Sequence, residues 1–175
     1  MNDSIVIRES MADDLAAIES LYPAVFPDED LLPLIRSLLR ETPAPLSLVG
    51  LIDLELLAHV MFTHCSVEGS NLKAALLGPL AVTPALQRQG IGTALVHAGL
   101  KRLEDTGLSQ VYVLGDPAYY GRFGFTPEPR VMPPYALPPE WNGAWQSKTL
   151  RDTEAHPEGK LSLPGPWLQP ALWAP

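Results

Sequence analysis

The sequence is short of cysteine, of positive charge and of long apolar runs. Cys65 is the only cysteine among 175 residues, so the chain cannot form an internal disulfide. A lone cysteine is more often a small buried hydrophobe than a nucleophile. Twelve Lys and Arg residues are outnumbered by twenty Asp and Glu, which gives a net charge of -8. This balance argues against nucleic acid or an anionic membrane surface as the main partner and suits a cationic small molecule.

Targeting signals are missing as well. The stretch MNDSIVIRES contains neither the basic region nor the apolar segment of a secretory signal peptide. The longest apolar runs elsewhere fall well short of the roughly 20 residues that cross a bilayer. We therefore expect a cytoplasmic protein without a membrane-spanning segment.

The composition favours one globular unit. Hydrophobic residues make up 46% of the chain and charged residues 18%, so the chain has too much apolar material to stay disordered. A length of 175 residues corresponds to about one domain and is enough to bury a core. We expect a single domain over residues 1–175.

Apolar spacing predicts strands and helices along the first half. Ile5 and Ile7 alternate with polar neighbours as in a half-buried strand, while Ser10 with Asp13 resembles a capping box that opens a helix. Apolar residues at helical spacing predict a second helix over residues 31–39. Three consecutive strands, interpreted as an antiparallel meander, are expected over residues 46–52, 56–68 and 72–82.

A proline interrupts the third of these strands. Pro79 has no N–H to give to a ladder, so we expect the sheet to lose pairing there. A helix follows, and Gly99 on its apolar stripe indicates a close approach to the sheet. A further strand is expected over residues 110–116 and a turn or short helix over 117–123.

The last part of the chain is rich in proline and tryptophan. Most of the nineteen prolines lie beyond Thr126, and one strand is expected within residues 144–150. Tryptophans are costly to leave in water, so we interpret this part as an irregular flap packed on the core. Trp141 and Trp145 either seal the core, which we favour, or line an acceptor pocket. The tryptophans are Trp141, Trp145, Trp167 and Trp173.

The stretch QRQGIGTALV, residues 87–96, has the character of an anion-binding loop. Gly90 and Gly92 open a helix, whose first N–H groups and positive dipole end favour a phosphate. The lysine of phosphate-transferring NTPase loops is missing, and Arg88 is the one cation of the loop. Leu95 occupies the third glycine position of the dinucleotide fingerprint, so that motif is not met. These features favour a diphosphate that is held rather than transferred.

Two segments together resemble the GNAT-type N-acetyltransferase superfamily. The run LGPLAVTPALQRQGIGTALV is similar to its acyl-CoA-binding motif, and GDPAYYGRFGF is similar to the later segment that carries an aromatic-tyrosine pair and a terminal Gly-Phe. The matched positions are Gln87, Gly90, Gly92, Tyr119, Tyr120, Arg122, Gly124 and Phe125. The segment LGDPAYYGRFGF is also similar to the corresponding segment of a group of small bacterial predicted acetyltransferases. The resemblance covers roughly residues 4–126.

The resemblance implies a fold and a cofactor. The fold is a mixed α/β arrangement, with a central, mostly antiparallel sheet splayed between strands 4 and 5 and flanked by helices. Residues 1–126 would form this core, and residues 127–175 would pack on it. The cofactor is acetyl-CoA, and no metal is implied. The backbone and loop residues implied to bind coenzyme A are Leu80, Ala81, Val82, Gln87, Arg88, Gln89, Gly90, Ile91, Gly92 and Thr93.

The resemblance also implies direct acetyl transfer to a primary amine in a ternary complex. Tyr120 occupies the position of the family's tyrosine acid, and a phenol can protonate a departing thiolate. His59 is our candidate for the base, with His64, Glu55 and Glu68 as alternatives. His59 and His64 have opposite parity on one expected strand, so they point to opposite faces.

Two other functions remain open from the sequence. A non-catalytic acyl-CoA-binding or sensing module would keep the loop and give up Tyr120. A nucleotide-dependent enzyme of Rossmann type is disfavoured, because residues 44–82 lack alternating strands and helices. The expected partner is a small amine, possibly a cationic one, and the sequence leaves the oligomeric state open between monomer and homodimer.

Overall fold

The structure, a computed structural model, describes residues 4–141, 143–152 and 157–175. The chain forms two compact units. The first comprises Met1–Phe62 and Gly78–Lys101, and the second comprises Thr63–Leu77 and Arg102–Pro175. The division does not fall near residue 126, and the expectation of a single domain stays a prediction.

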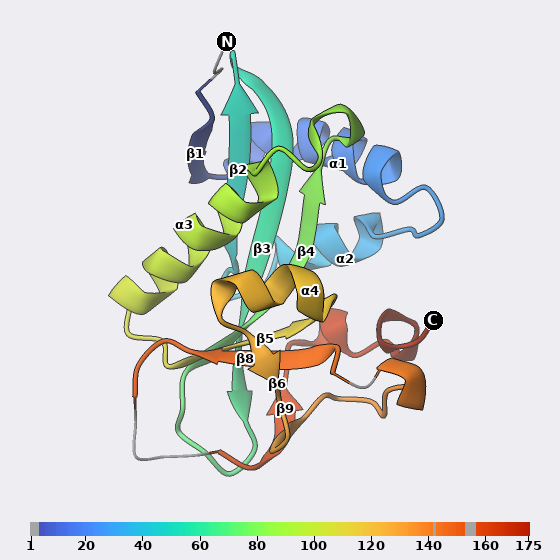
Figure 1. Ribbon diagram of the computed structural model, residues 1–175. Helices are drawn as coiled ribbons and strands as arrows, with labels where there is room; N and C mark the ends of the chain where they lie inside the picture. Colours follow the sequence, from blue (N-terminus) through green and yellow to red (C-terminus); the bar gives the residue numbers. More distant parts are fainter. Residues whose placement is uncertain (1–3, 142, 153–156) are drawn as a thin grey trace. The chain divides into compact units, whose positions relative to one another are not determined.

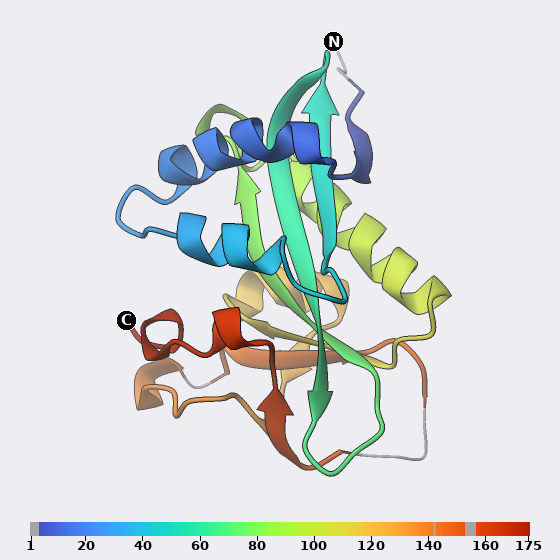
Figure 2. The same cartoon turned by 180° about the vertical axis from the view of Figure 1, so that it is seen from behind.

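The first unit is a sheet with helices on both faces. Strand β1 runs antiparallel to β2, and β2 runs antiparallel to β3. Helix α3 covers one face of β2 and β3 (Figure 1), and helices α1 and α2 cover the opposite face (Figure 2). Its elements are β1 (Val6–Glu9), η1 (Ala12–Asp14), α1 (Leu15–Val25), α2 (Leu32–Leu38), β2 (Leu46–Ile52), the first part of β3 (Glu55–Val67), the end of β4 (Ala74–Val82), η2 (Pro84–Leu86) and most of α3 (Ile91–Asp105).

Close packing in the first unit depends on a glycine of α3. A Cβ added at Gly99 would collide with the aromatic ring of Phe62 on β3, whose Cδ2 would lie 3.0 Å away. Phe62 itself is fully buried. The predicted close approach of this helix to the sheet is therefore confirmed, and it explains why a side chain is not tolerated at Gly99.

The second unit contains both parallel and antiparallel strand pairs. Strand β4 runs parallel to β5, and β5 pairs antiparallel with β8, which pairs with β6. The end of β3 pairs antiparallel with β9, which lies parallel to β7. Its further elements are β5 (Gln110–Leu114), α4 (Pro117–Tyr120), η3 (Gly121–Phe123), β6 (Thr126–Pro127), β7 (Val131–Met132), η4 (Pro139–Trp141), β8 (Trp145–Thr149), β9 (Gly159–Ser162), η5 (Gly165–Trp167) and η6 (Pro170–Trp173).

Tryptophans fix the C-terminal part of the second unit. Trp167 donates its Nε1–H to the hydroxyl of Thr63 on β3 at 3.0 Å, and Trp173 donates to the Trp167 carbonyl, also at 3.0 Å. Trp173 also packs edge-on against Trp145, with ring centroids 5.8 Å apart. Trp145 is buried and donates to Val131 O at 2.8 Å. The interpretation of Trp145 as a core residue agrees with this geometry, whereas Trp141 is half-buried.

The start of the first helix differs from the prediction by one residue. The carboxylate of Asp14, not Asp13, accepts the backbone N–H of Met11 at 2.7 Å. Ser10 instead donates its hydroxyl to that of Ser47 on β2, at 2.7 Å. Asp14 takes the capping position because its carboxylate is also held by Arg8, at 2.7 and 2.9 Å. Sequence spacing alone did not show this ion pair.

The β4–β5 ladder is short. The paired residues run from Ala74 with Gln110 to Leu77 with Val113, although β4 continues to Val82. The next two residues of β4 are Gly78, with φ 140, and Pro79, which has no N–H to donate. Pairing with β5 thus ends at Leu77, two residues before Pro79, and is lost at the proline as the sequence predicts.

Candidate active site

The predicted anion-binding loop lies in the first unit between β4 and α3. Gln87 donates its side-chain amide to the Val82 carbonyl at 3.0 Å, which ties the loop back to the end of the strand. Arg88 and Gly90 have left-handed backbones, with φ 64 and φ 84. For Arg88 this conformation is costly, and such outliers gather at functional sites. Alternation of left-handed and ordinary residues turns successive N–H groups into an anion-binding concavity.

Helix α3 begins directly after this loop. The N–H of Ala94 donates to the Gly90 carbonyl at 3.0 Å, an i to i−4 bond of the first turn. The N–H groups of Ile91 and Gly92 precede that bond and have no acceptor within the helix. A Cβ on Gly90 would meet no heavy atom within 4 Å, so the space beside this backbone is open. The amides and the positive end of the helix dipole together suit an anion.

The strand residues predicted to contact a cofactor lie at the end of β4. Ala81 is buried, while Leu80 and Val82 are half-buried. The strand ends where the Thr83 N–H donates to the Leu57 carbonyl of β3 at 2.8 Å. Leu80 and Val82 lie beyond the last residue of β4 that pairs with β5.

Tyr120 ends α4 in the second unit, among other aromatic rings. Its ring lies edge-on to Tyr119 and Phe125, with centroids 5.0 and 5.8 Å away. Burial raises the pKa of the Tyr120 phenol, and the neighbouring Tyr119 acts in the same direction. The hydroxyl therefore keeps its proton across the physiological pH range. Arg122 lies over the ring of Tyr119, 4.6 Å from its centroid.

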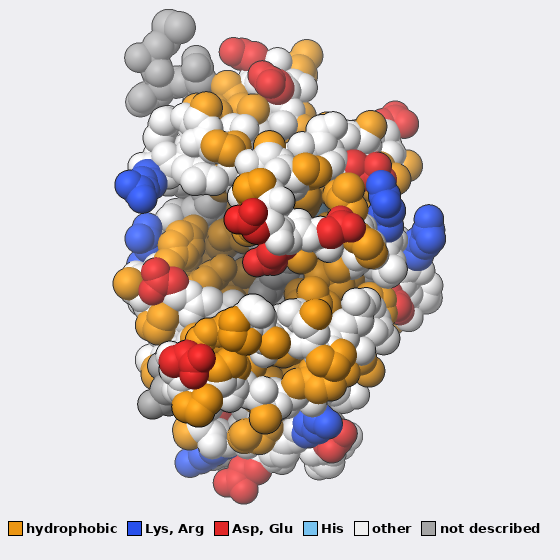
Figure 3. Space-filling view, turned by 90° about the vertical axis from the view of Figure 1, so that its right-hand side faces the viewer, with side chains coloured by type: hydrophobic (Ala, Val, Ile, Leu, Met, Phe, Trp, Pro, Cys, Tyr) orange, Lys and Arg blue, Asp and Glu red, His pale blue; other side chains and the backbone are white. Residues whose placement is uncertain are grey.

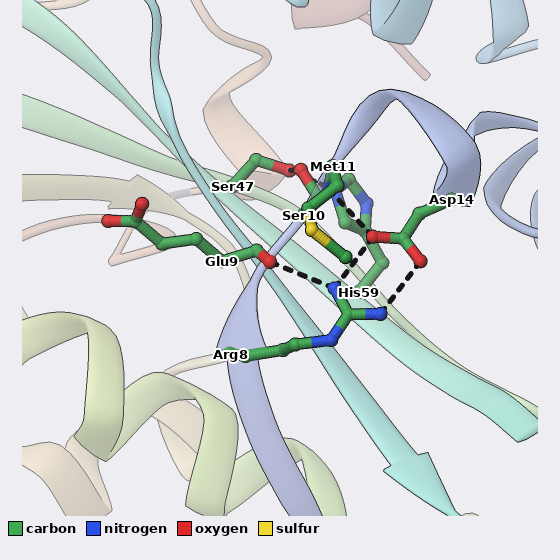
Figure 4. A network of polar contacts seen from close by, with 7 residues as sticks. All are labelled: Arg8, Glu9, Ser10, Met11, Asp14, Ser47 and His59. Atoms are coloured by element: carbon green, nitrogen blue, oxygen red, sulfur yellow. Dashed lines mark hydrogen bonds and ion pairs between the residues drawn. The ribbon is translucent and has the colours of Figure 1, made fainter. Parts of the chain in front are cut away.

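His59 lies in a buried polar network of the first unit (Figure 4). Its Nδ1 is 2.7 Å from the Tyr22 hydroxyl, and its Nε2 is 2.8 Å from the Ser47 hydroxyl, to which Ser10 donates. Burial lowers the pKa of His59 to about 4, against the opposing effect of the Asp14 carboxylate. His59 has no exposed surface, so the geometry gives its predicted role as base no support. That role stays a prediction.

The alternative bases are all exposed. Glu55 begins β3, while His64 and Glu68 belong to the second unit, at the far end of β3 and just after it. The predicted opposite orientation of His59 and His64 agrees with their buried and exposed states. From the sequence we expect His156 in the acidic loop to be a surface group, and this residue lies outside the described residues.

Comparison with known proteins decides the family. Residues 12–125 match the acetyltransferase (GNAT) family. The N-acetyltransferase YjhQ of Escherichia coli is 31% identical over 152 residues, which cover 83% of this chain and 82% of YjhQ. The chain belongs to the GNAT family.

Solved structures agree with this assignment. The crystal structure of E. coli YhbS in complex with CoA superposes with a TM-score of 0.83 at 28% identity, covering 97% of this chain and 94% of YhbS. A Brucella melitensis GNAT acetyltransferase in complex with acetyl-CoA has a TM-score of 0.75 at 27% identity, covering 94% of this chain and 99% of that one. The chain thus has the GNAT fold, a mostly antiparallel sheet with a parallel β4–β5 pair and flanking helices, and is an acetyl-CoA-dependent N-acetyltransferase.

The residues of the GNAT loop fit coenzyme A. Its diphosphate is a dianion that needs several donors at one point, and the N–H groups of Ile91 and Gly92 are donors of that kind. The open space beside Gly90 leaves room for such a group. Asp116, by contrast, accepts the Ala118 N–H at 2.9 Å and caps α4.

Figure 3 shows one face of this GNAT protein, which carries both acidic and basic side chains. Basic side chains lie apart near its margins, and acidic ones are scattered between them. Among the residues that the structure describes, none of the helices combines the length and apolar character needed to span a bilayer.

Sequence reasoning missed the residues that hold His59. Tyr22 lies on α1 and Ser47 on β2, 37 and 12 residues away in sequence. A tyrosine on an apolar helix face and a serine in a strand are ordinary core residues, and no motif joins them. Their common partner appears only when the sheet and helix are packed.

Proposed function

We propose that this enzyme transfers the acetyl group of acetyl-CoA directly to a primary amine within a ternary complex. The observation that carries the proposal is the loop from Gln87 to Gly92, whose left-handed residues and first-turn amides form an anion site with open space beside it. Bound acetyl-CoA would supply an activated acyl group in its thioester. The amine nitrogen forms the new bond to the acyl carbon as the carbon–sulfur bond breaks.

The chain would hold the cofactor mainly through its backbone. The N–H groups from Arg88 to Thr93 hold the diphosphate, and the Gln87 side chain fixes the loop by its bond to Val82. The end of β4, Leu80 to Val82, no longer pairs with β5, so its main chain is available to the pantetheine arm and thioester carbonyl. Donors fixed in position stabilise the charge that develops on that carbonyl.

Tyr120 is our candidate for the acid. Its raised pKa keeps the phenol protonated, so the hydroxyl can donate to the departing thiolate at any physiological pH. The same rise in pKa makes the phenol a weaker acid. We therefore assign Tyr120 the role of a hydrogen-bond donor to the thiolate as the C–S bond breaks, and after that the role of its proton source. The aromatic rings around it hold the phenol in one orientation.

The proton released by the amine needs an acceptor. His59 has both ring nitrogens engaged and a lowered pKa, which makes it a poor acceptor at neutral pH. The exposed groups Glu55, His64 and Glu68 remain candidates, and each would act through water. Substituting the true base should remove the acidic limb of the pH–activity profile, which is the fall in activity at low pH, and this separates the three candidates.

The amine substrate is proposed from charge. A net charge of -8 draws a cationic amine to the protein and repels polyanions, and the cytoplasm would supply both the amine and acetyl-CoA. The non-catalytic alternative would bind acetyl-CoA without consuming it.

Release of free thiol from acetyl-CoA tests the proposal. We would assay the enzyme with cadaverine, tryptamine, a lysine amide and a peptide with a free N-terminus, beside calorimetric titration with CoA. We expect turnover with at least one amine and an about 10²-fold lower kcat for Tyr120→Phe. Tight CoA binding without turnover on any of these amines would favour the sensing module. Turnover that is unchanged in Tyr120→Phe would remove the phenol from the mechanism while leaving the cofactor site in place.

A further inference from the structure

Gly115, at the end of β5, lies against the ring of Tyr120. A β-carbon built on Gly115 would lie 2.8 Å from Tyr120 Cδ2 and 3.4 Å from Cζ, with Cε2 closer than either. Atoms of a side chain at 115 and of the phenol ring would therefore occupy the same space. The missing side chain at Gly115 is what lets the ring lie where it does.

The backbone at Gly115 is held in place. Its N–H donates to the Ala144 carbonyl at 3.0 Å, and its carbonyl accepts the side-chain amide of Gln146 at 3.1 Å. Gln146 is buried on β8, the strand that pairs with β5. A larger residue at 115 would therefore displace the ring rather than the strand end.

Aromatic side chains also pack around the Tyr120 ring. Phe125, which is buried, lies edge-on to Tyr120 at 5.8 Å, and Phe123 and Tyr119 have centroids 6.3 and 5.0 Å away. The backbone of α4 fixes the base of the side chain, because the Tyr120 N–H donates to the Asp116 carbonyl at 3.0 Å. Gly115 and these aromatic side chains thus form the walls around the ring.

We propose that Gly115 is a positioning residue for catalysis, which sets the direction of the Tyr120 hydroxyl through the position of the ring. This inference rests on the proposed role of Tyr120 as the acid. A shift of about 1 Å in a catalytic group can cost about 10²-fold in rate, so the ring need not move far.

The test compares Gly115→Ala with Gly121→Ala, a matched control. Gly121 lies in the same segment with φ -56, and a Cβ there meets no heavy atom within 4 Å. Each variant would be made in the wild-type and in the Tyr120→Phe background. We would measure kcat and the KM for acetyl-CoA with the amine of highest turnover, and the thermal midpoint of each protein. We expect Gly115→Ala to lower kcat by about 10 to 100-fold with little change in KM, and Gly121→Ala to lower it less than about twofold.

The double variant gives the decisive comparison. Gly115→Ala should add less than about twofold to the loss in Tyr120→Phe, because both changes remove one interaction. An equal loss in both backgrounds, or a kcat of Gly115→Ala close to wild type, would overturn the inference. If Tyr120→Phe itself has the kcat of the wild type, the proposed role of Tyr120 as the acid is wrong. That result can be told apart from a failure of the inference about Gly115.

A second variant keeps the test decisive if Gly115→Ala does not fold. Phe125→Leu removes one of the aromatic walls around the ring and leaves Gly115 intact. We expect Phe125→Leu to lower kcat in the wild-type background. In the Tyr120→Phe background it should cause no further loss of kcat. A loss that persists there would show that the walls act on something other than the phenol, and the inference would fall.

Discussion

The Tyr22 hydroxyl lies 2.7 Å from the Nδ1 atom of His59, between helix α1 and strand β3. The imidazole is neutral in this position, because burial lowers its pKa to about 4 and its other nitrogen is engaged by Ser47. One ring nitrogen donates and the other accepts, so two hydroxyls in the core are satisfied by a single side chain. The network joins helix α1, which carries Tyr22, to strands β2 and β3, which carry Ser47 and His59.

Stability should fall in mild acid because of His59. Its pKa is about 4 in the folded protein and 6.5 in the unfolded chain, so the unfolded chain binds an extra proton between these values. The free energy of unfolding therefore decreases as pH falls from about 6.5 to 4, by up to about 3 kcal/mol. Denaturant unfolding at a series of pH values measures this slope.

A histidine on the same strand provides the control. His64 is exposed, so His64→Gln should keep the slope. His59→Gln should flatten it, since its side chain has no charge to gain. A slope that is the same in wild type and His59→Gln would contradict the buried titration.

His59→Asn separates structure from catalysis. Asn can keep one hydrogen bond but leaves a hydroxyl in the core unpaired, which costs about 1 to 3 kcal/mol of stability. We expect a lower thermal midpoint and a kcat within about threefold of wild type, measured below the unfolding range. A fully folded variant with an about 10²-fold lower kcat and no acidic limb in its pH–activity profile would restore His59 as the base.

Gly90→Ala should weaken cofactor binding. An L-residue at φ 84 costs about 1 to 2 kcal/mol, and the loop can relieve that cost by turning its amides away from the ligand. We expect a several-fold higher KM for acetyl-CoA and a nearly unchanged kcat.

Gly69→Ala is the matched control for that change. Gly69 has φ 80 and, like Gly90, open space at its Cβ position, but it lies in the turn after β3. Both variants should lose similar stability, and only Gly90→Ala should raise KM. Equal KM values for the two variants would show that the backbone at 90 has no part in binding.

Trp173 should contribute strongly to stability. It is 2% exposed, packs on Trp145 and donates to the Trp167 carbonyl. Trp173→Ala should cost about 3 to 5 kcal/mol in chemical denaturation, as expected for a buried tryptophan. Leu168→Ala, at a residue that is 46% exposed, should change little. A small loss for Trp173→Ala would mean that the C-terminal part is not packed on the core.

Local patterns in the sequence predicted much of the fold. Period-two and helical spacing located β2, β3, β5 and the helices, and Pro79 predicted where the β4–β5 ladder ends. The short strands β6, β7 and β9 were not predicted. Strands β6 and β7 are too short to show an alternation of apolar and polar residues, and the pairing of all three is set by distant partners. Asp14 was missed for a similar reason, since its capping position depends on Arg8.

Some features of the candidate site could likewise be predicted from local sequence, and others could not. The loop from Gln87 to Gly92 follows from glycine spacing and a helix start, both of which are local. The burial of His59 is not local, because a histidine in an apolar strand has the same sequence pattern whether its ring meets solvent or Tyr22. The contact of Gly115 with Tyr120 also depends on how the chain turns after β5.

Calorimetric titration of the wild-type enzyme with CoA and with pantetheine tests the central claim most directly, since the two share the thiol arm and only CoA carries the diphosphate. If the amides at the start of α3 hold the diphosphate, CoA should bind at least about tenfold more tightly than pantetheine. Added salt should reduce this difference in affinity. Equal affinities for CoA and pantetheine would contradict the account.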